Sequence, residues 1–235
     1  MPRLPRSRWT KRLSLKGLTL KMRRIAFYGG SFDPPHNGHL AIARALTRQF
    51  SLDEFVFIPA FHAPHKLRLE PTSAYDRFAM LCLATQAEDN FTVDKREIMR
   101  PEPTFSVDTL GSLNKQFPDD KIFFVMGADS WQDILTWREW ETVLTMTNHI
   151  VVTRPGHEIK VGHVTDSVRE RIVDLRGKSG DDSAQIDKRI YFTDVVQCDV
   201  SATEIRRSIR DGSTEWRTDV PDTVAKYILK YQIYK

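Results

Sequence analysis

Cysteine is scarce in this sequence: the only two, Cys82 and Cys198, lie far apart and form no Cys-x-x-Cys pair. This spacing gives no basis for a disulfide framework or a zinc site, and it fits a reducing cytoplasm. No apolar run approaches the roughly 20 residues that a membrane-spanning helix needs. The chain also lacks internal repeats, low-complexity tracts, and the Walker A and Gly-x-Gly-x-x-Gly patterns. We therefore expect a cytoplasmic protein without a membrane partner.

Acidic residues are missing from the first 24 positions, which hold nine of the 35 lysines and arginines. The remaining 26 basic residues face 31 acidic ones, so the body of the chain is acidic although the whole carries a net charge of +4. Net charge therefore gives little support for nucleic-acid binding by the folded part. Residues 1–21 are predicted to be a basic, disordered extension, with a transit-like segment, an arm for anionic surfaces and a start at Met22 as alternatives. Residues 22–235 are predicted to form a single domain.

Short apolar runs alternate with stretches of helical periodicity over most of the chain. Strands are predicted at 25–28, 55–58, 91–93, 122–126, 149–153 and 190–192. Helices are predicted at 40–46, 74–87 and 106–117, in a stretch that runs through Trp137, Trp140 and Val143, and at 202–210 and 222–231. This alternation predicts an α/β fold with a mainly parallel sheet, helices on both faces and a C-terminal helical segment. Residues 157–189 are polar and too weakly periodic for an assignment.

The most informative stretch joins the first predicted strand to the first helix, at residues 28–40. Gly29 and Gly30 allow a sharp turn and a close approach of the backbone to a ligand. A strand end that leads into a helix is where open α/β sheets bind nucleotides. His36 and His39 are three residues apart, so they lie on one face of the first helical turn. Together with the free N–H groups of a helix start, they favour a phosphate ligand.

The charge of these histidines depends on the ligand. Histidine is mostly neutral at pH 7, because its reference pKa is about 6.5. A phosphate oxygen about 4 Å away would favour the imidazolium by roughly 4 kcal/mol at an effective dielectric constant near 20. We therefore expect His36 and His39 to be cationic when a nucleotide is bound, and to clamp phosphates rather than act as bases. The structural alternative is a pair of ordinary helix-surface histidines after a proline turn.

A second helix start, at residues 200–210, combines hydroxyl groups with arginines. Ser201 and Glu204 match a capping box, so Ser201 should begin the helix. Hydroxyls, free N–H groups and Arg206 would meet at this helix start, which is a natural site for a nucleotide phosphate. The structural alternative is an ordinary helix cap that contributes about 1 kcal/mol to stability.

These stretches together resemble the nucleotidylyltransferase superfamily, and most closely the bacterial nicotinate-nucleotide adenylyltransferases. The family pattern Gly-x-Phe-Asp-Pro-x-His-x-Gly-His corresponds to residues 30–39. The later pattern Ile-Ser-Ala-Thr-x-Ile-Arg corresponds to residues 200–206, where valine replaces the first isoleucine. Intermediate blocks are similar at 64–66, 104–110, 127–129 and 136–138. The resemblance covers residues 23–235 and implies a Rossmann-like nucleotidylyltransferase fold.

The resemblance implies that the chain transfers the adenylyl group of ATP to nicotinate mononucleotide and releases pyrophosphate, in NAD biosynthesis. Magnesium is expected on the triphosphate, with few ligands from the protein. Three alternatives remain open: the same chemistry on nicotinamide mononucleotide, phosphopantetheine or a cytidylyl acceptor, a non-catalytic nucleotide sensor, and nucleic-acid binding through residues 1–24. An oligomer is possible, and the preference for the acid over the amide stays open.

The resemblance also implies roles for individual residues. The catalytic group that holds the ATP phosphates would be His36, His39 and Arg206, helped by Ser201 and Thr203. The rest of ATP would contact the backbone of Gly30, Ser31 and Phe32, and Gly127 and Asp129 near the ribose and adenine. The pyridine nucleotide would contact Trp137, Thr104 and Ser106, with added positive charge from Lys66 and Arg154. The alternatives are a core position for Trp137 and a solvated loop position for Lys66.

Overall fold

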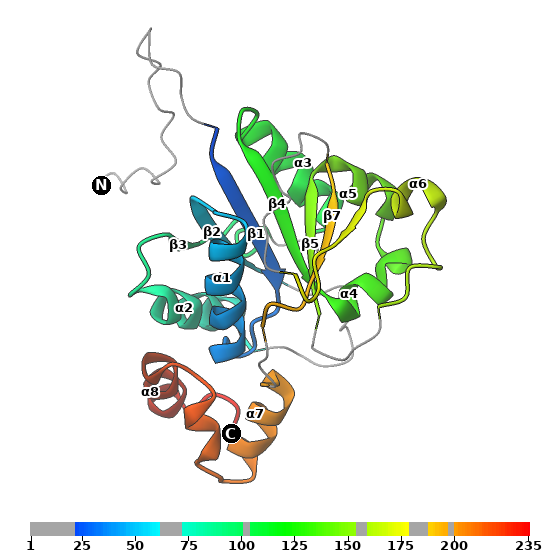
Figure 1. Ribbon diagram of the computed structural model, residues 1–235. Helices are drawn as coiled ribbons and strands as arrows, with labels where there is room; N and C mark the ends of the chain where they lie inside the picture. Colours follow the sequence, from blue (N-terminus) through cyan, green and yellow to red (C-terminus); the bar gives the residue numbers. More distant parts are fainter. Residues whose placement is uncertain (1–21, 62–71, 101–103, 154–158, 179–187, 197–199) are drawn as a thin grey trace, which may run out of the picture.

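The computed structural model describes residues 22–61, 72–100, 104–153, 159–178, 188–196 and 200–235. Its strands are β1 Arg24–Gly30, β2 Glu54–Pro59, β3 Phe91–Val93, β4 Lys121–Gly127, β5 Asn148–Val152, β6 Ile172–Asp174 and β7 Ile190–Thr193. They form a seven-stranded sheet in the order β3-β2-β1-β4-β5-β7-β6, and every neighbouring pair is parallel (Figure 1). The predicted α/β class and parallel sheet are therefore confirmed.

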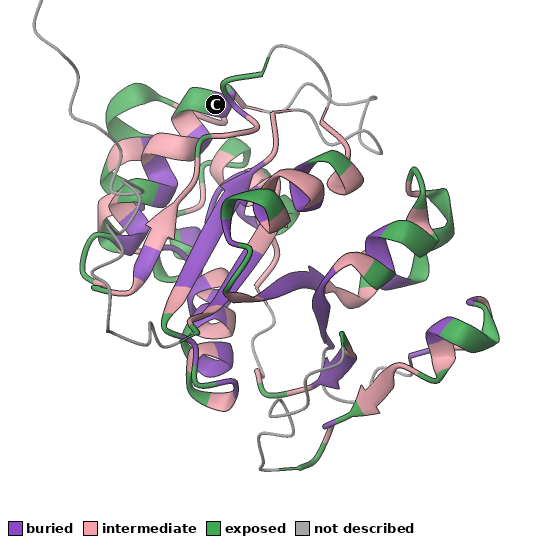
Figure 2. Cartoon of the chain, turned by 90° about the horizontal axis from the view of Figure 1, so that it is seen from above, coloured by how far each residue is buried: buried purple, intermediate pink, exposed green. Residues whose placement is uncertain are grey.

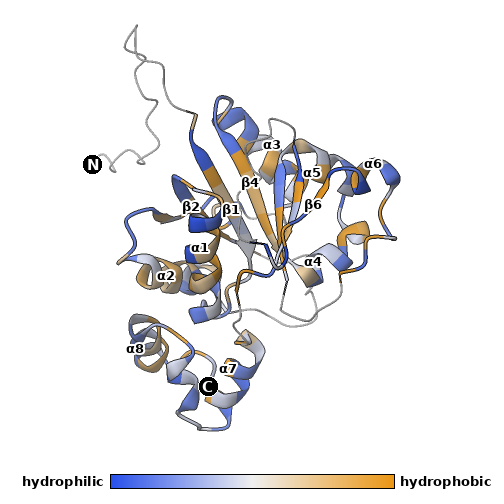
Figure 3. Ribbon diagram, in the orientation of Figure 1, coloured by the Kyte–Doolittle hydropathy of each residue, from blue (hydrophilic) through white to orange (hydrophobic). Residues whose placement is uncertain are grey.

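The helices lie on both faces of the sheet. They are α1 Asn37–Gln49, α2 Ala74–Thr85, α3 Ser106–Gln116, α4 Ala128–Gln132, α5 Trp140–Met146, α6 Asp166–Arg169, α7 Ala202–Arg210 and α8 Asp222–Tyr231, with 3₁₀ turns η2 Ile134–Thr136 and η3 Glu215–Thr218. Side chains of α1, α2, α7 and α8 pack in one hydrophobic core, and those of α3 to α6 pack in the other. Figure 3 shows apolar residues concentrated on the strands and polar residues on the outer helix surfaces.

Strand residues alternate between the two cores because successive side chains of a strand point to opposite faces of the sheet. In β4, Phe123 and Val125 join the core on the α1 side, whereas Ile122 and Phe124 join the core on the α3 side. Because both faces are covered, the central strands read as continuous apolar runs, which is typical of parallel sheets. Figure 2 shows the same arrangement as buried central strands between partly exposed helices.

The strand order places a reversal beside β1. The chain moves from β1 to β2 and β3 on one side of β1, and then returns to β4 on its other side. Open α/β sheets bind ligands at such a reversal, outside the carboxyl ends of the strands. The ends of β1 and β4 are therefore the place in this fold where a ligand is expected.

Two parts of the secondary structure differ from the sequence-based prediction. The single helical stretch through Trp137 is wrong: it is divided into α4, η2 and α5, because Trp137 is extended and Glu139 has a left-handed φ of 51°. The strand β6 was not predicted, and among the described strands it pairs with β7 at the edge of the sheet. It has three residues, Ile172, Val173 and Asp174, none of them fully buried, and it lies within the polar stretch that was left unassigned.

The C-terminal helices α7 and α8 pack against the same core as α1 and α2. Ile205 of α7 and Val224 and Ile228 of α8 are nearly or completely buried there. The hydroxyl of Tyr227 donates a hydrogen bond to Asp76 in α2 over 2.8 Å. In the part of the chain that the structure describes, no helix is both long and apolar enough to cross a membrane.

Candidate functional site

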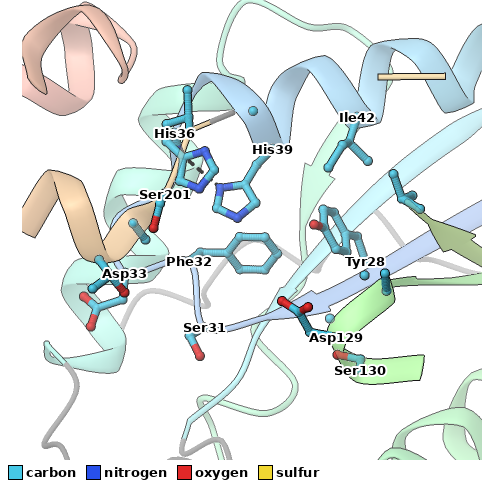
Figure 4. Close-up of a pocket in the computed structure, with 18 of the residues that line it drawn as sticks. Tyr28, Ser31, Phe32, Asp33, His36, His39, Ile42, Asp129, Ser130 and Ser201 are labelled. Atoms are coloured by element: carbon cyan, nitrogen blue, oxygen red, sulfur yellow. Dashed lines mark hydrogen bonds between the residues drawn. The ribbon is translucent and has the colours of Figure 1, made fainter. Parts of the chain in front are cut away.

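A pocket of about 590 Å³ opens where the strands β1, β4 and β5 end. Figure 4 shows residues of the β1–α1 loop, of α1, of α4 and of the α7 start around it. Ten residues expected to bind substrates line it: Ser31, Phe32, His36, His39, Gly127, Asp129, Trp137, Ser201, Thr203 and Arg206. The two helix starts that the sequence analysis singled out therefore share one pocket, which we call the strand-end pocket.

Phe32 shapes the turn between β1 and α1. Its backbone φ of 49° lies in the left-handed region that non-glycine residues seldom adopt, and its side chain is 3% exposed. A Cβ atom added to Gly30 would come within 2.9 Å of the Phe32 ring, so a larger residue there would force the ring to move. The Phe32 ring packs against the rings of Tyr28 and His39, with centroids 5.4 and 4.9 Å apart. The turn therefore fixes the position of the His39 imidazole.

His36 is the N-cap residue of α1, and His39 lies in the first turn of the helix. The backbone N–H of His36 donates a hydrogen bond to Nδ1 of His39 over 3.1 Å, and the two rings stack with centroids 3.7 Å apart. Burial, together with the nearby His36, lowers the pKa of His39 well below its ordinary value near 6.5. His39 is therefore neutral at pH 7 in the ligand-free protein. Because its Nδ1 accepts a hydrogen bond, its proton lies on Nε2.

Three backbone donors at the start of α1, those of His36, Asn37 and His39, are already used within the protein. Asn37 donates from its backbone N–H to the carbonyl of Asp219 and from its side-chain amide to the carbonyl of Thr218, both over 2.8 Å. The N–H of His39 donates to the carbonyl of His36 over 3.0 Å. The sequence analysis assumed free N–H groups at this helix start, and for these residues that assumption is wrong. The start of α1 offers imidazole groups to the strand-end pocket instead.

The start of α7 is arranged differently. Ser201 is the N-cap residue, as predicted, but the expected capping box is wrong, because the Ser201 side chain makes no capping hydrogen bond and Glu204 is exposed. Ser201 lines the strand-end pocket instead. The N–H groups of the first helical turn have no acceptor inside a helix, and no other described residue accepts from those of residues 202–204. These donors stay available at the edge of the pocket.

Arg206 joins the two helix starts. Its Nη1 donates to the backbone carbonyl of Asp33 over 2.5 Å, and its Nη2 contacts the hydroxyl of Thr203 at 3.3 Å. Asp33 lies in the loop that precedes α1, so this contact ties α7 to that loop. A guanidinium has five N–H donors, so further donors remain for a ligand in the pocket.

Gly127, Asp129 and Trp137 line the opposite side of the strand-end pocket, after β4. The Trp137 ring also packs on the α3-side core, 6.4 Å from the ring of Phe124, so its core and pocket positions are compatible. The neighbouring Arg138 places its guanidinium 5.0 Å above the ring of Phe105, the N-cap residue of α3. The start of α3 therefore lies next to the Trp137 segment.

Five expected residues are not placed in the pocket lining. Gly30, Thr104 and Ser106 are not among the described residues that line it, although Gly29 and Ser31 on either side of Gly30 are. Ser106 is the first residue of α3, beside the Trp137 segment as described above. Lys66 and Arg154 lie outside the residues that the structure describes.

The sequence analysis missed Arg77, which is 1% exposed in α2. Its guanidinium donates to the carbonyls of Ser31, Phe61 and Thr72 over 2.6, 3.0 and 2.9 Å. It thereby fixes the turn after β1 to the segments on either side of residues 62–71. Its helical spacing carried a signal, because the pattern puts this arginine on the apolar face of α2 with Ala74, Leu81 and Ala84.

Carboxylates reach the strand-end pocket from Asp33, Asp129 and Asp133. Among the described residues, however, no group of three or more His, Cys, Asp or Glu side chains is placed to hold a metal ion. Both Asp33 carboxylate oxygens already accept hydrogen bonds within the protein. A metal ion in this pocket would therefore need most of its ligands from a bound substrate.

Comparison with known proteins gives one family. The cytidylyltransferase-like family matches residues 27–208. A probable nicotinate-nucleotide adenylyltransferase of Desulfatibacillum aliphaticivorans is 36% identical over 217 residues, covering 90% of this chain and 99% of the relative. A protein of the same description from Thermus thermophilus is 34% identical over 212 residues, covering 90% of this chain and all of the relative.

Solved structures give the same fold. The Plasmodium falciparum nicotinic acid mononucleotide adenylyltransferase complexed with NaAD superposes with a TM-score of 0.69 at 18% identity, covering 90% of this chain and 97% of that one. A putative nicotinate-nucleotide adenylyltransferase from Vibrio parahaemolyticus gives a TM-score of 0.57 at 16% identity, covering 91% and 96%. The Rossmann-like nucleotidylyltransferase architecture is therefore confirmed.

Proposed function

The chain belongs to the cytidylyltransferase-like family, among its nicotinate-nucleotide adenylyltransferases, and on this basis we propose how its pocket residues work. It transfers the adenylyl group of ATP to nicotinate mononucleotide, which gives deamido-NAD and pyrophosphate in NAD biosynthesis. The observation that supports the site assignment is the meeting of two helix starts, from α1 and α7, in one pocket at the sheet reversal.

The reaction needs positioning rather than a strong base. A phosphate monoester has a second pKa of about 6, so the phosphate of nicotinate mononucleotide is largely dianionic at pH 7. One of its oxygens attacks the α-phosphorus of ATP, and the bond to the β-phosphate oxygen breaks with its electron pair on pyrophosphate. The protein has to hold two anions in line and stabilise the charge that develops on the leaving group.

His36 and His39 contact the ATP phosphates from the α1 side of the strand-end pocket. His39 acts as a neutral donor through Nε2–H, because its Nδ1 accepts from the backbone of His36. The cationic form expected for the nucleotide-bound state requires a second proton on Nδ1 and the loss of that hydrogen bond. A nearby phosphate favours this proton, whereas burial opposes it.

Ser201, Thr203 and Arg206 contact the phosphates from the α7 side. The open N–H groups of the first turn of α7 carry a partial positive charge, which favours an anion. Arg206 keeps its contact with the Asp33 carbonyl and uses its remaining N–H donors for phosphate oxygens. A divalent metal accompanies ATP in this reaction, and we propose magnesium carried by the triphosphate.

The other substrate contacts follow the positions around the pocket. The backbone of Gly30, Ser31 and Phe32 runs along the nucleotide, and Gly127 and Asp129 are near its ribose and adenine. Trp137 stacks on the pyridine ring, and backbone near Thr104 and Ser106 receives its carboxylate. Lys66 and Arg154, outside the described residues, add positive charge. All of these residues belong to a single domain, residues 22–235, that follows a basic extension at residues 1–21.

An acceptor panel tests the proposal. Pyrophosphate release is measured with ATP and, in separate reactions, nicotinate mononucleotide, nicotinamide mononucleotide and phosphopantetheine. We expect the fastest release with nicotinate mononucleotide and none with phosphopantetheine. Equal rates with the acid and the amide would contradict the proposed contact with the pyridine carboxylate. Binding of ATP without pyrophosphate release from any acceptor would indicate a nucleotide sensor instead.

A further inference from the structure

The last residues of the chain return from α8 to the strand-end pocket. After α8, Gln232 and Tyr234 adopt left-handed φ angles of 55° and 72°, and the N–H of Ile233 donates to the carbonyl of Ile228 over 3.1 Å. The C-terminus consequently ends beside α7, as Figure 1 shows. The hydroxyl of Tyr234 donates a hydrogen bond to Oδ1 of Asp33 over 2.6 Å. This contact joins two residues at opposite ends of the described chain.

Asp33 is a junction of the pocket. It is 9% exposed, lines the strand-end pocket and lies three residues before His36 (Figure 4). Its Oδ2 accepts from the N–H of Thr72 at 3.3 Å, and its backbone carbonyl accepts from Arg206 over 2.5 Å. Asp33 therefore connects the α1 start, the α2 segment, the α7 start and the C-terminus.

The hydrogen bond from the Tyr234 hydroxyl to the Asp33 carboxylate, at 2.6 Å, is shorter than the one from the N–H of Thr72, at 3.3 Å. Burial and the adjacent Asp33 both raise the pKa of Tyr234, so the phenol keeps its proton and stays a donor. A buried carboxylate that loses a hydrogen-bond donor is destabilised, because its charge is no longer compensated, and a new contact with another donor lowers that cost. Two cationic groups lie close to Asp33: Arg206 contacts its backbone carbonyl, and Arg77 interacts electrostatically with its carboxylate but is already bonded to three backbone carbonyls. Loss of the phenol would draw Arg206 toward the carboxylate and away from a ligand.

We propose that Tyr234 is a positioning residue of the ATP site, which holds the Asp33 turn and so keeps Arg206 free for phosphate. This inference rests on the function proposed above, because it assigns the pocket to ATP. Tyr234 is not among the residues that line the pocket, so it supports the ATP site through Asp33, which does line it.

The test compares two tyrosine variants that each lose one tyrosine–aspartate hydrogen bond. Tyr234→Phe removes the contact with Asp33, and Tyr227→Phe removes the contact of α8 with Asp76, which is outside the pocket lining. The dissociation constant of the non-hydrolysable analogue α,β-methylene-ATP is measured by calorimetry on the full chain. We expect binding about tenfold weaker for Tyr234→Phe and within twofold of wild type for Tyr227→Phe, with circular dichroism unchanged in both.

A double-mutant cycle asks whether Tyr234 acts through Asp33. Asp33→Ala should weaken analogue binding, and adding Tyr234→Phe to it should change binding by less than twofold. With nicotinate mononucleotide as the acceptor, Tyr234→Phe should raise the KM for ATP and leave the KM for the acceptor within twofold. Equal analogue affinity in Tyr234→Phe and wild type, or additive effects in the cycle, would overturn the inference. Because analogue binding needs no turnover, these outcomes are independent of the acceptor panel.

Discussion

The two helix starts in the strand-end pocket differ in whether their backbone N–H groups are already bonded within the protein. At α1 the backbone donors of His36, Asn37 and His39 are bonded within the protein, and the imidazole rings are packed against each other. At α7 the Ser201 side chain leaves the first-turn N–H groups uncapped, and Arg206 reaches across to the loop before α1. The α1 start therefore presents mainly imidazole side chains, whereas the α7 start presents open backbone donors together with the side chains of Ser201, Thr203 and Arg206.

The comparison shows that a helix start near a strand end is not by itself an anion site. Its donors bind a ligand only if the protein does not use them first. At α1 three of them are bonded to Asp219 and within the His36–His39 pair, which leaves the N–H of Gly38 and the imidazole groups for a phosphate. Substitutions at the two helix starts should therefore differ in which replacement side chain restores turnover.

The largest loss is expected from His39→Ala. Removing one preorganised donor typically lowers turnover by on the order of 10² to 10³-fold. His39→Gln keeps a neutral donor near the Nε2 position, so it should recover part of the turnover lost in the alanine variant. Pyrophosphate release measures both, and circular dichroism checks that they fold. An alanine variant with near-normal turnover would remove His39 from the mechanism.

Arg206→Ala should lower turnover by about 10²-fold, because it removes a phosphate donor and the contact with the Asp33 carbonyl. Arg206→Lys keeps the charge but loses the planar set of donors that serves two partners at once. We therefore expect only a partial recovery in the lysine variant, again measured as pyrophosphate release. Full recovery in Arg206→Lys would show that charge alone suffices at the α7 start.

Gly30→Ala tests the packing that closes the α1 start. Its Cβ would meet the Phe32 ring at 2.9 Å, so the ring and the attached turn have to shift. We expect a loss of about 1–3 kcal/mol in unfolding free energy and roughly tenfold weaker binding of α,β-methylene-ATP. Gly162→Ala is the matched control, because its Cβ would meet no atom within 4 Å. Equal stability of the two variants would show that the Phe32 ring is not held as described.

Acid should weaken the parts of the structure that bury the histidines His39 and His149. Burial lowers the pKa of His39, and it lowers the pKa of the core residue His149 to about 3. The unfolded chain binds these protons near pH 6.5 and the folded chain at lower pH, so the stability that they contribute is present above pH 6.5. It is lost as the pH falls below 6.5, by up to about 1.4 kcal/mol per pH unit for each ring, and for His149 the loss continues toward pH 3.

Urea unfolding at pH 7.5, 6.5, 5.5 and 4.5 measures this effect. We expect a shallower loss of stability in His149→Leu and His39→Gln than in wild type, and an unchanged slope in Arg206→Lys. Burial raises the pKa of Glu97 to about 7, so this residue adds stability as the pH falls. Because its contribution is the same in every variant, differences between the variants report on the histidines. The same slope in all four proteins would contradict the lowered pKa values.

The local sequence predicted the regular elements well where caps and apolar spacing agreed. The predicted ranges of α7 and α8 match the structure because the helical spacing of the buried residues Ile205 in α7 and Val224 and Ile228 in α8 sets their inner faces, although the Ser201 side chain makes no cap. Prediction failed at Glu139, whose left-handed φ breaks a helical stretch, and at β6, whose residues stay partly exposed at the sheet edge. Neither feature has a local sequence signal strong enough to predict it.

The candidate site divides in the same way. The histidines that line the pocket were predicted because histidines and glycines at a strand end have few structural uses in that spacing. The supporting residues were not: Arg77 had a weak signal in its helical spacing, and Tyr234 had none. Their partners are backbone carbonyls and a distant carboxylate, which no local pattern reveals.

By itself the sequence determined most of the alternation of strands and helices, the parallel sheet and the two helix starts that line the strand-end pocket, because these follow from periodicity and turn residues. Only the tertiary structure decided which backbone donors stay open, since that depends on acceptors such as the Asp219 carbonyl that arrive from far along the chain. It also brought Tyr234 to Asp33 and Arg77 to Ser31. Hydrogen bonds between distant segments form only when packing has already placed both partners.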